Sequence, residues 1–244
     1  MKMKLLACDV LSRELCSIAA DSPSVVDVHF LPSTLHDVPE QLRVEVQAEV
    51  DASEGKGYEA IVLGYGLCSR GTAQVSARSV PLIVPRAHDC ITLFLGSRSR
   101  YDAEFTGNPG TYYFTSGWCE RKDGTVDQGV VRDRKADHYE QRFREYAEKY
   151  GEDNARFLIE QETQWLANYT RATFIDTGVG DSSKYREFTR DLACQRGWEF
   201  AEIPGDLGLL ARMLAGDWRP EEVLRVEPGQ TIAESFDELV LKVR

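Results

Sequence analysis

The chain has 244 residues, 42% of them hydrophobic, and a formal net charge of −11. A globular chain of this length buries about 70% of its unfolded surface, so it needs neither disulfides nor a structural metal to fold. The acidic excess argues against nucleic acid as the main ligand. No apolar run reaches the roughly 18 residues of a membrane span, and Asp9 and Arg13 interrupt the first apolar run too early for a signal peptide. We therefore expect a cytoplasmic protein whose six cysteines stay reduced.

Strands and helices alternate through the first hundred residues. Apolar runs predict strands over residues 5–10, 25–31, 58–66 and 81–85. Helices are predicted after the first run, over residues 40–52 and over residues 90–96. Such alternation implies right-handed crossovers. The predicted fold class is therefore α/β, with a mostly parallel, Rossmann-like sheet flanked by helices.

The second half of the chain contains another strand–helix–strand pattern. Three strands are predicted here. The first follows the turn signal Asn108-Pro109-Gly110, and the other two span residues 170–177 and 198–203. Residues 121–129 are predicted to form a polar loop. The charged stretch 136–167, broken near Gly151, predicts a solvated helical pair. Residues 205–214 predict a last helix, and the tail predicts edge strands at 223–226 and 238–243. The repetition leaves open whether residues 1–244 form one domain or two similar lobes with a boundary near 130–165.

Three cysteines follow three different predicted strands. Cys8 lies at the end of the first, Cys68 comes just after the run that ends in Gly66, and Cys90 follows residues 81–85 by a short loop. The carboxyl ends of parallel strands meet at one edge of a sheet, where ligands of α/β proteins bind. If these strands are neighbours, the three thiolates and the imidazole of His88 converge. Zinc accepts that ligand set, and a three-cysteine site also suits an iron–sulfur cluster.

Other readings of these residues stay open. Buried cysteines are often core fillers, which suits the remaining three, Cys16, Cys119 and Cys194. For His29 and His36, beside a proline-containing loop, we expect surface or capping roles.

Several polar residues near the predicted edge are candidates for catalysis or ligand binding. His88 and Asp89 are candidate proton carriers, although Asp89 is equally a candidate helix cap. Arg86 is a candidate for holding an anionic substrate. A glycine-containing segment is a candidate cofactor- or anion-binding turn; its residues are Gly66, Ser69 and Arg70.

Four segments resemble the family called domain of unknown function 1638. They are Gly64-Tyr65-Gly66-Leu67-Cys68, the stretch from Pro85 to Ser97 that contains His88-Asp89-Cys90, Asn108-Pro109-Gly110-Thr111-Tyr112-Tyr113 and Phe174-Ile175-Asp176-Thr177-Gly178. The resemblance implies that Cys8, Cys68, His88 and Cys90 are motif positions. It also implies an origin in anaerobic bacteria or archaea, in settings rich in corrinoid methyl transfer. The chain departs from the family's Cys-Glu pair, because Asp9 follows Cys8.

Three functions are consistent with these observations. The first is a metal-dependent enzyme, such as a small-molecule or methyl/thiol group transferase, with zinc or an iron–sulfur cluster as cofactor. The second is a non-catalytic accessory or carrier protein for a metal, a cluster or a corrinoid methyltransferase partner. The third is a metal-free enzyme with a Cys/His nucleophile, using Cys68 or Cys90 with His88.

Overall fold

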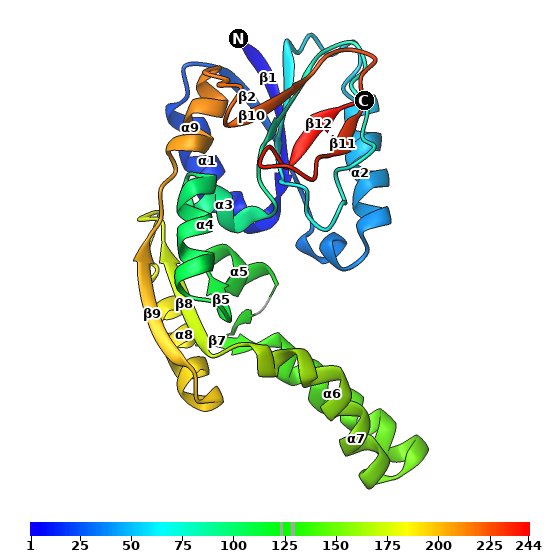
Figure 1. Cartoon of the computed structure of the whole chain (residues 1–244), viewed down its shortest axis with the longest axis vertical. Helices are drawn as coiled ribbons and strands as arrows, with labels where there is room; N and C mark the ends of the chain where they lie inside the picture. Colours follow the sequence, from blue (N-terminus) through cyan, green and yellow to red (C-terminus); the bar gives the residue numbers. More distant parts are fainter. Residues whose placement is uncertain (123, 128–129) are drawn as a thin grey trace. The chain divides into compact units, whose positions relative to one another are not determined.

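The computed structural model describes residues 1–122, 124–127 and 130–244. Its alternating strands and helices confirm the predicted α/β fold class (Figure 1). The chain divides into two compact units. Unit 1 contains residues 1–104, 177–180 and 204–244, and unit 2 contains residues 105–176 and 181–203. We describe each unit by itself.

The central sheet of unit 1 is mostly parallel. Its strand order is β10-β4-β3-β1-β2. The four strands β1 to β4 run parallel, and β10 closes the edge antiparallel to β4. Their bounds are β1 (Lys2–Cys8), β2 (Val25–Leu31), β3 (Ala60–Gly64), β4 (Leu82–Pro85) and β10 (Val223–Val226). The apolar runs of the sequence thus predict all four parallel strands.

Helices cover both faces of this sheet. Figure 1 shows α1 (Ser12–Asp21) and α9 (Gly208–Ala215) on one face, and α2 (Pro39–Asp51) on the other. Because both faces are covered, every residue of β3 is buried, as is typical of a parallel strand. Shorter elements complete the unit: η1 (Asp9–Leu11), η2 (Ser33–Asp37), α3 (Cys90–Leu95), β11 (Ile232–Glu234) and β12 (Leu241–Val243). Helix α4 (Arg98–Gly107) follows α3 in the chain.

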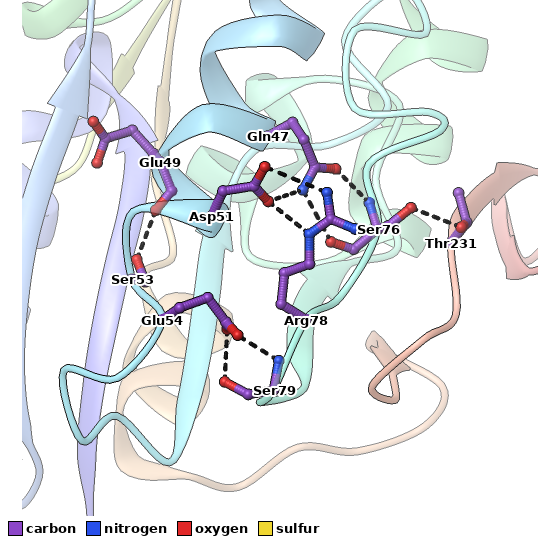
Figure 2. Close-up of polar contacts among 9 residues, drawn as sticks. All are labelled: Gln47, Glu49, Asp51, Ser53, Glu54, Ser76, Arg78, Ser79 and Thr231. Carbon is purple, nitrogen blue, oxygen red and sulfur yellow. Dashed lines mark hydrogen bonds and ion pairs between the residues drawn. The ribbon is translucent and has the colours of Figure 1, made fainter.

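A polar network ties the long segment between β3 and β4 to α2 (Figure 2). The Arg78 guanidinium donates to Asp51 Oδ1 over 2.7 Å, and the Gln47 amide both donates to Asp51 and accepts from the Ser76 backbone N–H. The Ser76 and Thr231 hydroxyls lie 2.8 Å apart. The hydrogen bond from Arg78 holds the pKa of Asp51 below its usual value. These contacts fix the part of the segment around Ser76 and Arg78, shortly before β4.

Unit 2 has a smaller sheet with strand order β5-β8-β9, in which β5 and β8 run parallel. Its elements are β5 (Thr111–Phe114), α5 (Ser116–Arg121), β6 (Gly124–Asp127), β7 (Val130–Asp133), α6 (Arg134–Tyr150), α7 (Glu152–Thr163), η3 (Gln164–Asn168), β8 (Arg171–Asp176), α8 (Ser183–Arg196) and β9 (Glu199–Pro204). Phe114, Phe174 and Tyr185 lie in its buried core. The predicted break between two charged helices at Gly151 is confirmed, since that residue has φ 83° and separates α6 from α7.

The predicted polar loop over residues 121–129 is wrong in part. Residues 124–127 pair antiparallel with residues 130–133 to form the hairpin β6–β7, which packs against α5 and α8. Residues 123, 128 and 129 of the predicted loop lie outside the described residues. None of the helices in the described part of the chain combines the length and the apolar character that crossing a membrane requires.

Candidate functional site

The strand order places a topological switch point between β1 and β3. From β1 the chain first adds β2 on one side and later adds β3 on the other, so the loops that follow β1 and β3 diverge. Cys8 is the last residue of β1, and the register pairs Ala7 with Gly64 at the end of β3. Tyr65 follows directly. The carboxyl edge, where these parallel strands end, therefore carries Cys8 and Tyr65 beside the switch point.

The loops that follow β3 and β4 are held together by their backbones. The Leu67 N–H donates to the Ala87 carbonyl and the Cys68 N–H to the His88 carbonyl, each over 2.8 Å. This contact requires glycine at position 66, because a Cβ there would lie 2.5 Å from the Ala87 carbonyl oxygen. Cys68 is thereby fixed alongside the loop that leads to Cys90.

Three consecutive non-glycine residues adopt left-handed backbone conformations at this edge. Cys68, Ser69 and Arg70 have φ angles of 47°, 53° and 72°. The Gly71 N–H donates to the Cys68 carbonyl over 2.9 Å, which closes a tight turn with Ser69 and Arg70 at its centre. Each such residue costs about 1–2 kcal/mol. Strain of this kind concentrates at functional sites, so the turn points to a role for the segment that carries Cys68.

The structure brings the three predicted cysteines to the same edge, and all three are buried. The exposed fractions of Cys8, Cys68 and Cys90 are 1%, 4% and 4%. Within residues 1–122, 124–127 and 130–244, however, no three histidine, cysteine, aspartate or glutamate side chains form a group that could hold a metal ion. The shared edge agrees with the prediction from the sequence, whereas coordination of a metal stays a prediction.

His36 lies against the first of these thiols. Its Nδ1 is 3.1 Å from the Ser33 carbonyl oxygen and 4.0 Å from Cys8 Sγ. A carbonyl only accepts hydrogen bonds, so Nδ1 carries a proton and the lone pair of a neutral His36 lies on Nε2. Asp9 links the segments that follow β1 and β2, because its Oδ1 accepts a hydrogen bond from the Ser33 N–H over 2.9 Å. His36 thus contacts both the Ser33 carbonyl and Cys8, and the surface or capping role expected for it stays a prediction.

Tyr65 is the residue that the sequence analysis missed. Its side chain is 1% exposed, and its hydroxyl finds no hydrogen-bond partner in the described part of the chain. Burial raises the pKa of Tyr65 well above its usual value, and the neighbouring Cys8, Cys68 and Asp9 raise it further. An unsatisfied buried hydroxyl beside two thiols is the kind of group that a ligand satisfies.

His88 and Asp89 lie next to each other in the loop after β4 but differ in their exposure to solvent. His88 is exposed, whereas Asp89 is half-buried and caps α3, with its Oδ1 accepting from the Ile91 N–H over 2.9 Å. The Tyr101 hydroxyl donates weakly to the other oxygen, over 3.4 Å. Burial raises the pKa of Asp89, against the opposing effect of these hydrogen bonds and of His88. The capping role is therefore present, and proton transfer by His88 or Asp89 stays a prediction.

The raised pKa of Asp89 makes its contribution to stability depend on pH. A carboxyl that is protonated more readily in the folded state stabilises the protein below its unfolded pKa, and that contribution is lost as pH rises through the folded pKa. We expect Asp89→Asn to keep the cap and remove this loss, so that it gains stability relative to wild type as pH rises above the ordinary pKa of aspartate. We expect Asp89→Ala to lose about 1 kcal/mol through the missing cap. Urea unfolding of both variants at several pH values measures the difference, and equal pH dependence of Asp89→Asn and wild type would contradict it.

The two predicted anion-binding arginines have partners within the protein. Arg86 donates to the carbonyl oxygens of Pro220, Leu239 and Leu241, and so anchors the C-terminal segment. Arg70 pairs with Glu234 over 3.1 Å. An anion-binding role for these arginines or for Gly66 and Ser69 stays a prediction.

The fold and the site together define a class: an α/β protein with a Rossmann-like parallel sheet and buried cysteines beside its switch point. The chain belongs to the family described as protein of unknown function (DUF1638), whose model matches residues 30–214. This match confirms the resemblance seen in the motifs, and its range contains Cys68, His88 and Cys90. Neither the curated proteins nor the solved structures contain a match to the chain.

Proposed function

We propose that the carboxyl edge of unit 1 binds a thiophilic metal centre, zinc or an iron–sulfur cluster, through Cys8, Cys68 and Cys90. The protein would use this centre as a cytoplasmic enzyme that transfers a methyl or other small group to or from a small molecule or thiol. A histidine, His36 or His88, would complete the ligand set or carry a proton.

The observation that carries the proposal is the Tyr65 hydroxyl. It is buried and lacks a partner among the described residues, and its pKa is raised by this burial and, to a smaller extent, by Cys8 and Cys68. Metal binding deprotonates cysteine and so creates the acceptor that a buried phenol needs. Hydrogen bonds to ligating sulfurs are also a common way to tune such centres.

The described side chains are not yet arranged as a ligand group, so binding would require a local rearrangement. Hydrogen bonds fix the backbone of Cys68 on the loop after β4, so this rearrangement would turn the cysteine side chains about their own bonds and leave the sheet in place.

The roles of this chain's own residues follow from their positions. A neutral His36 carries its lone pair on Nε2 and can accept a proton there, while its Nδ1–H remains directed at the Ser33 carbonyl. Tyr65 would donate a hydrogen bond to a thiolate or to the ligand. A bound metal would lower the pKa of a coordinated thiol or water. The family resemblance suggests a corrinoid or methyltransferase partner, which also keeps an accessory role open.

A second candidate function is metal-free thiol chemistry, and the contact between Cys8 and His36 favours it. The sequence analysis assigned such chemistry to Cys68 or Cys90 with His88. The 4.0 Å separation of Cys8 Sγ and His36 Nδ1 makes Cys8 the better candidate nucleophile. Protonated His36 beside this thiol would favour the thiolate, the reactive form of cysteine.

Elemental analysis of anaerobically purified protein separates the two candidates. We expect about one equivalent of zinc, or several of iron with sulfide, in wild type. Cys8→Ala, Cys68→Ala and Cys90→Ala should each lose most of it. The matched controls are Cys16→Ala and Cys194→Ala, because these exposed cysteines lie on α1 and α8 and should leave the metal content unchanged.

No metal above background, even after reconstitution with zinc or with iron and sulfide, would contradict the metal proposal. Alkylation with iodoacetamide then tests the second candidate. The measurement uses a Cys16→Ala/Cys194→Ala background, because these two exposed cysteines would be alkylated in any case. Thiol chemistry at Cys8 predicts one rapidly modified cysteine in that background, slowed by His36→Ala, whereas equally slow modification of Cys8, Cys68 and Cys90 would contradict it.

A further inference from the structure

A cluster of aromatic rings surrounds Tyr112 in unit 2. The ring centroids of Trp165, Tyr169 and Trp198 lie 6.3, 5.1 and 6.3 Å from that of Tyr112. Trp165 and Tyr169 meet edge to face with centroids 5.7 Å apart, and Tyr169 lies 5.9 Å from Trp198. All four side chains are only partly buried. Because they come from β5, η3 and the segments before β8 and β9, this aromatic cage is built by the tertiary fold.

A cation already lies in this cage. The Lys135 ammonium is 4.9 Å from the ring centroids of both Tyr112 and Trp165, and it donates to the Tyr112 hydroxyl over 2.5 Å. Lys135 belongs to the first turn of α6, whose backbone is held by Asp133 through a 2.9 Å hydrogen bond to the Lys135 N–H. The negative faces of the two rings are thus oriented toward a single positive charge.

Two members of the cage also line a hollow at the surface. Tyr169 and Trp198 border a pocket of about 500 Å³ together with Leu166, Thr170 and Arg196. The Arg196 guanidinium stacks 5.1 Å from the Trp198 ring and pairs with Asp133 over 3.0 Å. The cage therefore has space beside it for the remainder of a ligand whose cationic end enters between the rings.

We propose that this aromatic cage binds a methylated ammonium group, and that the Lys135 ammonium occupies it when no ligand is present. A quaternary ammonium group cannot donate a hydrogen bond and is weakly hydrated, so faces of several aromatic rings are its preferred surroundings. Lys135 is linked to the cage by a flexible side chain, so it can withdraw to solvent when a ligand enters. The site lies entirely within unit 2 and does not depend on the thiol chemistry proposed above.

Isothermal titration calorimetry with tetramethylammonium, choline and a short peptide containing trimethyllysine tests the proposal. Sodium chloride serves as the salt control. Binding of choline identifies a small-molecule ligand, and binding of the peptide alone identifies a methylated protein. Lys135→Ala should tighten binding about ten-fold, because the competing ammonium is removed.

Two further variants show whether the cage itself is responsible. Trp165→Leu should weaken binding about ten-fold or more, with a circular dichroism spectrum like that of wild type. Lys149→Ala is the matched control, because the Lys149 ammonium lies 4.9 Å from a single ring, that of Tyr150 on α6. It should bind like wild type. Absence of binding to both wild type and Lys135→Ala, or equal binding by Trp165→Leu, would overturn the proposal.

Discussion

Gly66→Ala is expected to destabilise unit 1 by about 3 kcal/mol, which is the upper end of the usual cost of overpacking. The new Cβ would lie 2.5 Å from the Ala87 carbonyl oxygen, 2.9 Å from its carbonyl carbon and 3.0 Å from the Asp89 nitrogen. All three are backbone atoms, so no side-chain rotation relieves the clash. The loops after β3 and β4 must separate, which breaks the hydrogen bonds that fix Leu67 and Cys68. Urea unfolding measures the loss.

Gly107→Ala provides the matched control for this substitution. A Cβ at Gly107 has no neighbour within 4 Å among the described atoms, and the residue is the last of α4. Alanine should therefore be neutral or stabilising by up to about 1 kcal/mol. If Gly66→Ala were as stable as wild type, the close contact between the two loops would be wrong. The fixed position of Cys68 would then lose its main support.

The parallel sheet could be predicted because its strands are buried on both faces. Residues 60–64 form a continuous apolar run, and glycines mark its end. The elements that were missed lack such a pattern. Helix α4 has no buried residue and therefore no apolar stripe, and β11 has only three residues. The hairpin β6–β7 consists of two four-residue strands within a polar stretch, where pairing depends on contacts with α5 and α8 rather than on local preference.

The candidate site could be predicted only as far as strand ends determine it. The rule that ligands bind at the carboxyl edge is sufficient to place Cys8, Cys68 and Cys90 at the same edge of the sheet. The same rule would have selected His36, which follows the end of β2 by five residues. Tyr65 could not be recognised as a site residue from the sequence, because it continues the apolar run of β3 and is typical of a core position. The left-handed turn at Cys68, Ser69 and Arg70 has no glycine at these three positions, so no local signal predicts it.

Tyr65→Phe is expected to stabilise the metal-free protein by about 1 kcal/mol and to weaken the binding of metal. The substitution removes only a hydroxyl that is buried and lacks a partner among the described residues, so the cost of its desolvation disappears. In the proposed bound state the same hydroxyl donates to a thiolate, so its loss there is unfavourable. Thermal unfolding with and without zinc, or with and without a reconstituted cluster, measures both effects.

Tyr185→Phe is the matched control, because it removes an equally buried hydroxyl that does have a partner. The Tyr185 side chain is 0% exposed, and its hydroxyl donates to Glu120. This variant should lose about 1 kcal/mol of stability and keep its metal. A gain in metal-free stability for Tyr65→Phe together with a loss for Tyr185→Phe would indicate that the Tyr65 hydroxyl is maintained for ligand binding rather than for folding. A loss of metal-free stability in Tyr65→Phe as large as that in Tyr185→Phe would show that the Tyr65 hydroxyl is already satisfied, and the central support for a metal centre at this edge would fail.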